Sequence, residues 1–250
     1  MKITNLNKHY GDKHVVNDVA FELPKGKVIS LIGPNGAGKS TVLNIITRLT
    51  PQDSGEIYFE GTELKAWNNK ELAKKLAILT QKNNIAMKLT VRELVSFGRF
   101  PYSSNNLTSE DYKMVDMAID YMELQEFSDQ FIDELSGGQL QRAYIAMVIA
   151  QDTDFVFLDE PTNNLDIYHS SNMMKLVRRL CDELGKTVIL VLHEINFASA
   201  YSDYIGAFKD GKLFKFGDVH EVMTKENLKT LYGVDFDIQM IKGKPISIYY

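Results

Sequence analysis

Cysteine is almost absent from this sequence, since Cys181 is the only one among 250 residues. A single cysteine cannot form an internal disulfide, which excludes a disulfide-stapled fold and suits a reducing compartment. Cys181 lies in an amphipathic helical pattern, where we expect it to fill the core.

Long apolar runs are also missing. Apolar runs such as residues 188–192 are far shorter than the ~20 residues that cross a bilayer. Residues 1–6 contain no apolar core of a signal peptide. We therefore expect a soluble cytoplasmic chain that reaches a membrane only through a partner.

An excess of basic charge is missing as well. The net charge is -5 and no basic run occurs, which argues against nucleic acid as a partner. There are no repeats and no low-complexity stretches. Hydrophobic residues make up 44% and charged residues 24%, an ordinary globular composition for one large domain, alone or with an inserted subdomain.

Glycines are concentrated in a segment that matches the G-x-x-x-x-G-K-[ST] pattern of a phosphate-binding loop. A β-branched apolar run at 28–32 precedes it, and a helical pattern at 42–46 follows it. The glycines let successive N–H groups turn toward phosphate oxygens, and the following helix adds its positive end. Lys39 can reach the β- and γ-phosphates, and the Ser40 hydroxyl can bind Mg²⁺. The predicted nucleotide-binding residues of this loop are Gly33, Pro34, Asn35, Gly36, Ala37, Gly38, Lys39, Ser40 and Thr41.

Two carboxylates follow the apolar run 155–158. Apolar residues on both faces of a strand indicate a central parallel strand, and α/β sheets bind ligands at the carboxyl ends of such strands. Asp159 can hold Mg²⁺, directly or through water, and Glu160 can act as the general base on the attacking water. The alternative is a solvated acidic pair.

Three further side chains lie near predicted strand ends. Tyr10 could stack on a nucleobase, or it could be a half-buried strand-end tyrosine. Gln81 could reach Mg²⁺ or water, or it could be a solvated amide. His193 follows the strand pattern 187–192 and could hydrogen-bond a γ-phosphate, or it could be structural.

A second anion-binding helix start is predicted at Ser136, Gly137, Gly138 and Gln139, directly before the helical run 140–150. The alternative is a simple helix cap. Residues 83–151 lose strand character, with a capping box at Thr90 and Glu93 and a loop at 101–106. We therefore expect a helical subdomain at 83–151, inserted into an α/β domain formed by 1–82 and 152–250.

Together these motifs resemble the ATP-binding cassette of ABC transporters over nearly the full chain. Residues 33–41 resemble the Walker A loop, and 155–160 resemble Walker B with its catalytic glutamate. Residues 135–142 resemble the signature motif, which is the most specific match, and 163–166 resemble the D-loop. Gln81, His193 and Tyr10 fall at the positions of the Q-loop glutamine, the switch histidine and the adenine-stacking aromatic. Asn163 and Glu194 depart from the residues common in the family, where Ser and Asp are usual.

The resemblance implies an α/β P-loop NTPase with a parallel central sheet, an antiparallel β subdomain and an inserted helical subdomain. It implies an active ATPase that uses ATP and Mg²⁺. Two copies would pack head to tail, with each ATP between Walker A of one copy and the signature motif of the other. Further partners would be membrane permease subunits and, indirectly, an extracytoplasmic substrate-binding protein. The chain would therefore lie at the cytoplasmic face of the membrane.

Residues 89–102, 136–153 and 193–198 resemble the corresponding segments of importers for iron–siderophore complexes, heme and cobalamin. The likeness is greatest to ATPases of ferric-siderophore importers, which gives iron–siderophore uptake as the expected function. Heme or cobalamin import remains an alternative. Two further alternatives are an exporter cassette, which would usually be fused to membrane spans, and a soluble cassette that acts on nucleic acid or ribosomes. A soluble cassette of this kind would usually carry a second cassette or long coiled coils.

Overall fold

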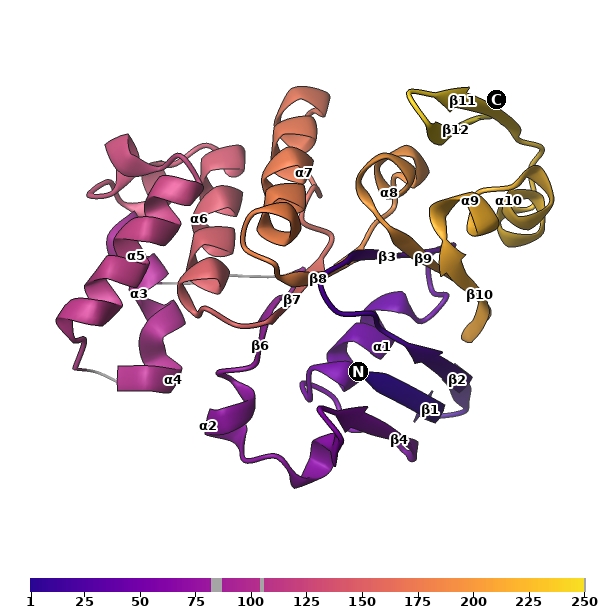
Figure 1. The fold of residues 1–250 in the computed structure, drawn as a ribbon, viewed down its shortest axis with the longest axis horizontal. Coiled ribbons are helices and arrows are strands. Elements are labelled where there is room, and N and C mark those ends of the chain that lie inside the picture. Colours follow the sequence, from indigo (N-terminus) through magenta and orange to yellow (C-terminus); the bar gives the residue numbers. More distant parts are fainter. Residues whose placement is uncertain (82–86, 104–105, 250) are drawn as a thin grey trace. The chain divides into compact units, whose positions relative to one another are not determined.

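The computed structural model describes residues 1–81, 87–103 and 106–249, which form two compact units (Figure 1). The first unit contains Met1–Trp67 and Arg178–Tyr250, and the second contains Asn68–Val177. In the described part of the chain, no helix combines the length and the apolar character that a membrane crossing demands.

The first unit contains an antiparallel sheet in the strand order β2-β1-β4-β5. Ile3 of the central strand β1 lies opposite Phe21 on one side and Ile57 on the other, and all three side chains are buried. Apolar residues alternate with polar ones along these strands, so one face of the sheet packs on the core and the other faces solvent. The strands are β1 (Lys2–Tyr10), β2 (Lys13–Glu22), β4 (Ser54–Phe59) and β5 (Thr62–Glu63), and η1 (Leu64–Ala66) follows.

The parallel strands of the first unit are arranged around β3 (Val28–Ile32), which lies between β8 (Thr187–Val191) and β9 (Tyr204–Lys209). β10 (Lys212–Asp218) pairs antiparallel with β9. Every residue of β3 and β8 is buried, which explains why both strands are mainly apolar. The predicted α/β class is confirmed.

Helices and a C-terminal hairpin complete the first unit. The Asn196 side chain donates to the carbonyl of Ser247 (3.0 Å) and accepts from its N–H (2.8 Å), which fastens the hairpin to α8. These elements are α1 (Lys39–Ile46), α8 (Ile195–Tyr201), α9 (Val219–Val222), α10 (Lys225–Tyr232), β11 (Asp237–Ile241) and β12 (Lys244–Ile248), and the last turn of α7 (Ile167–Asp182) belongs here too.

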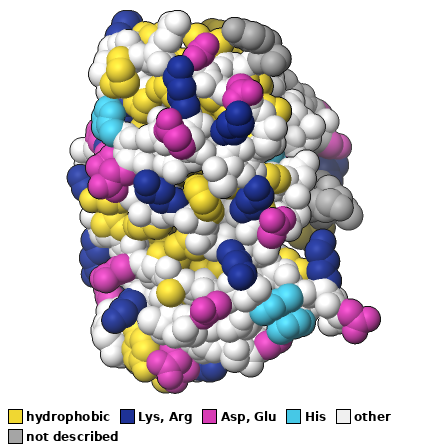
Figure 2. All heavy atoms as spheres, turned by 90° about the vertical axis from the view of Figure 1, so that its right-hand side faces the viewer, with side chains coloured by type: hydrophobic (Ala, Val, Ile, Leu, Met, Phe, Trp, Pro, Cys, Tyr) yellow, Lys and Arg dark blue, Asp and Glu magenta, His cyan; other side chains and the backbone are white. Residues whose placement is uncertain are grey.

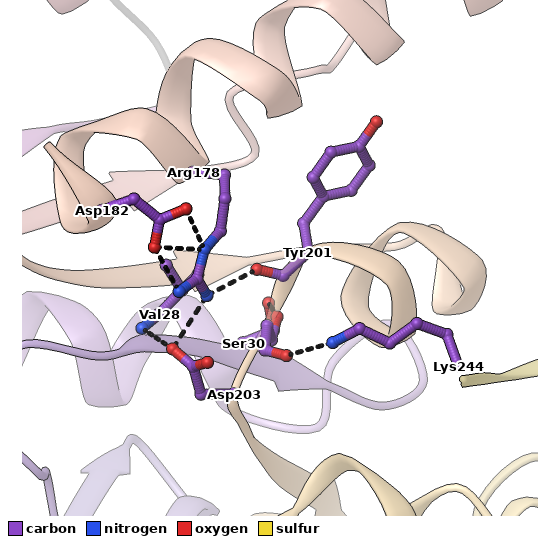
Figure 3. Close-up of polar contacts among 8 residues, drawn as sticks. Val28, Ser30, Arg178, Asp182, Tyr201, Asp203 and Lys244 are labelled. Atoms are coloured by element: carbon purple, nitrogen blue, oxygen red, sulfur yellow. Dashed lines mark hydrogen bonds and ion pairs between the residues drawn. The ribbon is translucent and has the colours of Figure 1, made fainter. Parts of the chain in front are cut away.

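An arginine joins three elements of this unit at the start of β3 (Figure 3). Arg178 donates to Asp182 within α7 (2.6 Å) and to Asp203 beyond α8 (2.8 Å). The same Asp203 oxygen accepts the Val28 N–H at 2.8 Å. The hydrogen bonds that Arg178 donates to the carboxylates of Asp182 and Asp203 raise its pKa. Because residue 33 lies at the other end of β3, this network anchors the strand without occupying its carboxyl end.

Ser30 of β3 (Figure 3), two residues after Val28, belongs to a buried serine pair. The hydroxyls of Ser30 and Ser202 are 2.6 Å apart and fully buried, so each satisfies the other. Lys244 of the hairpin donates to the Ser202 carbonyl at 3.3 Å. The hairpin is therefore tied to the core of the unit as well as to α8.

The second unit combines two parallel strands with helices. Leu79 of β6 (Leu76–Leu79) lies opposite Leu158 of β7 (Phe155–Asp159), so both strands end at one edge. The predicted loop at 101–106 is wrong for residues 101–103, because Pro101 fits the first turn of helix α4; residues 104–105 lie outside the described part. The helices are α2 (Asn69–Leu72), α3 (Val91–Ser96), η2 (Phe97–Arg99), α4 (Phe100–Ser103), α5 (Ser109–Tyr121), η3 (Gln125–Phe127), η4 (Ile132–Glu134) and α6 (Gly137–Ala150).

The expected boundaries of the helical subdomain, 83–151, stay a prediction. Of that range, residues 83–86 and 104–105 are outside the described part of the chain. The remainder belongs to the second unit.

A buried ion pair holds the helices of the second unit together. Arg99 donates from Nε to Asp111 (2.8 Å) and from Nη1 to the Ala150 carbonyl (2.8 Å). The two charged side chains are 7% and 3% exposed. Burial by itself would raise the pKa of Asp111, yet the hydrogen bonds that its carboxylate accepts hold that pKa well below the usual range. The pair therefore ties η2 to the start of α5 and the end of α6.

Replacing Asp111 with asparagine should lower the free energy of unfolding by about 3 kcal/mol, because it leaves the Arg99 charge buried without a counterion. Urea unfolding at pH 7 measures the loss. A carboxyl whose pKa is lowered by folding contributes stability above its unfolded pKa and loses it as the pH falls. The difference between wild type and D111N should therefore shrink below about pH 4.

Asp116→Asn is the matched control, because Asp116 pairs with Arg92 at the surface, where the two side chains are 58% and 39% exposed. That pair should contribute less than about 1 kcal/mol. Equal losses from both substitutions would contradict the structural role given to the buried pair.

Candidate functional site

The phosphate-binding loop at 33–41 joins β3 to α1 in the first unit. A Cβ atom at Gly33 would lie 2.0 Å from the Phe208 carbonyl oxygen, and one at Gly38 would lie 2.5 Å from the Val15 carbonyl oxygen. Both residues also have positive φ, at 141° and 95°. Only glycine fits this backbone, which the loop holds against β9 and β2.

The start of α1 is suited to an anion. Its N-cap is Gly38, so no side chain caps the helix, and its first turn contains no acidic residue. An anion at this position would meet the positive end of the helix dipole. The Lys39 ammonium donates to the carbonyls of Gly33 (2.8 Å) and Pro34 (3.1 Å), and the residue is 5% exposed. The loop therefore encloses a full positive charge.

Tyr10 stands at the end of the β1–β2 hairpin, in the same unit. Tyr10 pairs with Lys13 across the hairpin. Two residues further along β2, the carbonyl oxygen of Val15 faces Gly38 of the phosphate-binding loop. The tyrosine is 53% exposed. An aromatic ring is thus presented to solvent from a hairpin that packs against the phosphate-binding loop.

His193 follows β8 at the edge of the sheet where the phosphate-binding loop begins. Leu31 of β3 lies opposite Val191, and the Leu192 N–H donates to the Leu31 carbonyl at 3.1 Å. Parallel pairing therefore carries residues 33 and 193 to the same edge. His193 itself is exposed.

The second unit brings Gln81 and the two carboxylates together after β6 and β7. Asp159 is 5% exposed. Glu160 has a positive φ of 54°, and its Oε2 accepts hydrogen bonds from the side-chain amides of Gln81 (2.6 Å) and Asn163 (3.1 Å). The two amide donors therefore hold this carboxylate oxygen in one position.

The Asn163 contact was not evident from the sequence. Asn163 was identified only as a departure from a family pattern, yet its amide reaches the carboxylate three residues earlier. The spacing of three residues is the signal that could reveal this contact. The backbone turns after Glu160, and the Asn163 N–H donates to the Glu160 carbonyl at 3.1 Å. This turn brings the Asn163 side chain back to the Glu160 carboxylate.

The signature segment opens α6 in the second unit. Ser136 is the N-cap, and its side chain and that of Gln139 form a capping box. A Cβ atom at Gly138 would lie 3.0 Å from the His169 ring, which itself pairs with Asp166 at 2.8 Å. The loop therefore packs closely against the start of α7, and the helix end has the side-chain cap that the sequence offered as the alternative.

The structure thus groups the predicted residues in two sets. The phosphate-binding loop, Tyr10 and His193 belong to the first unit, while Gln81, Asp159, Glu160 and residues 136–139 belong to the second. Among the described residues, no cluster of three or more His, Cys, Asp or Glu side chains could hold a metal ion by itself. The roles given to the individual residues stay predictions.

Comparison with known proteins gives a consistent result. Residues 16–163 match the family model for ABC transporters. Over 250 residues, the chain is 52% identical to the petrobactin import ATP-binding protein YclP of Bacillus subtilis (strain 168). The match covers 100% of this chain and 99% of that protein. It is 47% identical to the petrobactin import ATP-binding protein FatE of Bacillus anthracis, over 100% of both chains.

A solved structure adds information on assembly and chemistry. It is a dimeric ATP-binding cassette in a post-hydrolysis state, bound to ADP and Pi, with a TM-score of 0.76 and 31% identity. The match covers 87% of this chain and 97% of that one. The likeness therefore extends to a cassette that was captured after splitting ATP.

Proposed function

Because this chain belongs to the ABC transporter family as an ATP-binding subunit, we propose that it powers the import of a ferric siderophore. The observation that carries the proposal is the 52% identity to a petrobactin import ATP-binding protein over the whole chain. The chain also retains each residue expected for hydrolysis, which supports an active subunit. Heme and cobalamin are the competing cargoes.

The chemistry is the hydrolysis of ATP. The phosphate-binding loop and Lys39 hold the phosphates, and Tyr10 stacks on the adenine ring. Glu160 accepts a proton from a water molecule whose oxygen bonds to the γ-phosphorus, while the bond from that phosphorus to the bridging oxygen of ADP breaks. His193 donates a hydrogen bond to the γ-phosphate. Gln81 and Asn163 hold the Glu160 carboxylate in place.

Mg²⁺ fits the donor set of this chain. Ser40, Gln81 and Asp159 offer a hydroxyl, an amide carbonyl and a carboxylate, all oxygen ligands of the kind that Mg²⁺ prefers. With phosphate oxygens completing the coordination, the ion would neutralise charge on the β- and γ-phosphates.

The working form is a head-to-tail dimer in which ATP lies between residues 33–41 of one copy and 136–139 of the other. Each chain has a helix start without a side-chain cap at residue 39 and a second, capped helix start at 136–139, and a two-fold dimer makes two identical sites from them. The dimeric, post-hydrolysis cassette described above supports this arrangement.

The permease docks in an apolar groove of the second unit. The groove has a volume of about 610 Å³. Its lining includes the apolar and aromatic residues Leu89, Phe97, Phe100 and Tyr112 and the charged residues Arg92 and Glu93. Phe97, Phe100 and Tyr112 are 45%, 57% and 49% exposed. Apolar rings rimmed by charge suit an amphipathic helix of a membrane partner. That partner keeps the chain at the cytoplasmic face of the membrane and connects it to an extracytoplasmic substrate-binding protein.

The cargo is tested with a strain that lacks this chain, grown with one iron source at a time. Growth on ferric petrobactin should be lost and should return when the wild-type chain is supplied. Loss of growth on heme alone, a requirement for added cobalamin, or unchanged growth on every ferric siderophore would overturn the proposal.

The same strain tests the groove. A chain with Phe97→Glu and Phe100→Glu should fail to restore growth, because two carboxylates replace the rings that meet an apolar partner helix. The purified variant should keep its basal ATPase rate, since neither ring belongs to the nucleotide site. Phe214→Glu, at a ring on β10 that is 39% exposed, is the control and should restore growth. Full growth with the double variant would rule the groove out as the permease site.

A further inference from the structure

Two histidines are stacked at the end of the hairpin that carries Tyr10. His9 of β1 and His14 of β2 are cross-strand partners, and the next pair along is Tyr10 with Lys13. Their ring centroids are 3.9 Å apart and the ring planes differ by 13°. Histidine side chains lie at the surface on the face shown in Figure 2. The stack is therefore the cross-strand pair next to the aromatic residue that we assign to the nucleobase.

Both rings have an oxygen acceptor. His9 Nδ1 lies 3.3 Å from Asp53 Oδ2, and His14 Nε2 lies 3.0 Å from the Asn7 side-chain oxygen. A neutral imidazole has one N–H, so each ring can donate to its acceptor without carrying charge. The stacked geometry is complete with both rings neutral.

Asp53 connects this stack to the rest of the sheet. Its carboxylate accepts from Lys8 Nζ (2.7 Å) and from the His9 N–H (2.6 Å), while its own N–H donates to the Asn7 carbonyl at 3.0 Å. The hydrogen bonds from Lys8 and His9 lower the pKa of Asp53 to about 2. The carboxylate is thus charged throughout the neutral range and ties the turn before β4 to β1.

Lys8 extends the connection to Tyr10. Its ammonium, held by Asp53, also lies 5.6 Å from the centroid of the Tyr10 ring. The Lys8 stem is largely covered, with the side chain 12% exposed. Asp53 therefore binds Lys8, which lies beside the Tyr10 ring, and His9, the residue that precedes Tyr10 on β1.

We propose that the His9–His14 stack, anchored by Asp53, positions Tyr10 for the nucleobase, and that protonation of both rings weakens nucleotide binding. This rests on the proposed role of Tyr10. The charged groups facing the stack are the Asp53 carboxylate and the Lys8 ammonium, with Asn7 as a neutral partner. One added proton is balanced by Asp53. Two imidazolium rings stacked 3.9 Å apart repel each other, so the second proton loosens the hairpin end.

The test compares the Kd for ADP at pH 7.5 and pH 5.5 in the wild type and in a variant with His9→Phe and His14→Phe, which keeps two stacked rings that cannot take a proton. The ratio of Kd at the two pH values should be about fivefold larger in the wild type than in the variant. Using the same nucleotide for both proteins cancels the titration of its phosphates. His220→Phe, at an exposed histidine of α9, controls for loss of a histidine elsewhere and should retain the wild-type ratio.

Inorganic tripolyphosphate, which has no base, separates positioning of Tyr10 from general damage to the hairpin. At each of the two pH values, the Kd for tripolyphosphate should be the same for the wild type and the double variant. Equal pH dependence of ADP binding in the two proteins, or a loss of tripolyphosphate binding in the variant, would overturn the inference.

Tyr10→Ala distinguishes failure of this inference from failure of the proposed function. If Tyr10→Ala leaves the Kd for ADP unchanged, the stacking role in the proposed function is wrong. If Tyr10→Ala weakens ADP binding while the histidine variant keeps the wild-type pH dependence, the inference about the stack alone is wrong.

Discussion

Replacing Glu160 with glutamine is expected to reduce the ATP turnover rate about a thousandfold while leaving nucleotide binding nearly intact. Glutamine has the shape of glutamate, but it cannot accept a proton from the attacking water. The backbone at this residue has a positive φ of 54°, and an isosteric side chain keeps it. Binding survives because Glu160 acts on water, whereas the phosphates are held by the loop at 33–41.

Two measurements on purified protein separate these effects. Steady-state phosphate release gives the turnover rate, and size-exclusion chromatography with ATP and Mg²⁺ gives the dimer fraction. E160Q should form an ATP-stable dimer, since the nucleotide that joins the two copies is not hydrolysed. Glu126→Gln, at an exposed carboxylate of η3, is the matched control and should hydrolyse ATP normally. Near-normal turnover by E160Q would remove Glu160 from the role of base.

The phosphate-binding loop shows what a sequence can establish without a structure. Its glycines, Lys39 and Ser40 lie within nine consecutive positions. Residues this close in the sequence must also lie close together in the structure. The same holds for the buried strands β3 and β7, whose mainly apolar sequences predict burial on both faces. These local signals gave the α/β class and the order of the motifs.

Contacts between residues far apart in the sequence could not be predicted in the same way. Asp53 meets His9 across 44 positions, and the stack of His9 on His14 depends on the register of two strands. That register shifts between Lys8 and His9, and a one-residue slip would turn the ring to the other face of the sheet. Alternation of apolar residues does not reveal such a shift, so the histidine pair appeared only in the structure.

The buried ion pair of the second unit was missed for a related reason. Arg99 and Asp111 each look like a surface charge in a polar helical segment, because charged residues are rarely buried. Their burial follows from the packing of η2 against α5 and α6, which brings each the partner that makes burial tolerable. Pro101 was similarly taken as a loop former, although proline is also compatible with the first turn of a helix.

Lys39→Ala should weaken ATP binding by at least about a hundredfold and abolish detectable turnover at millimolar ATP, because it removes the cation that the phosphate-binding loop encloses. The Lys39 ammonium is held by two loop carbonyls, at 2.8 and 3.1 Å, in a residue that is 5% exposed. Titration calorimetry with ATP and Mg²⁺ gives the Kd, and circular dichroism confirms that the variant is folded.

Lys39→Arg separates the charge from the geometry. Arginine keeps the positive charge, but its planar guanidinium is larger than an ammonium and presents its donors in a fixed fork. The enclosed space around Lys39 was built for a compact point charge, so K39R should bind ATP more weakly than the wild type and hydrolyse it far more slowly. Lys25→Ala, at a side chain that is 64% exposed, is the matched control and should leave both quantities unchanged. If K39A bound ATP as tightly as the wild type, the loop at 33–41 would not be the triphosphate site, and the assignment of every other nucleotide-binding residue in the chain would lose its reference point.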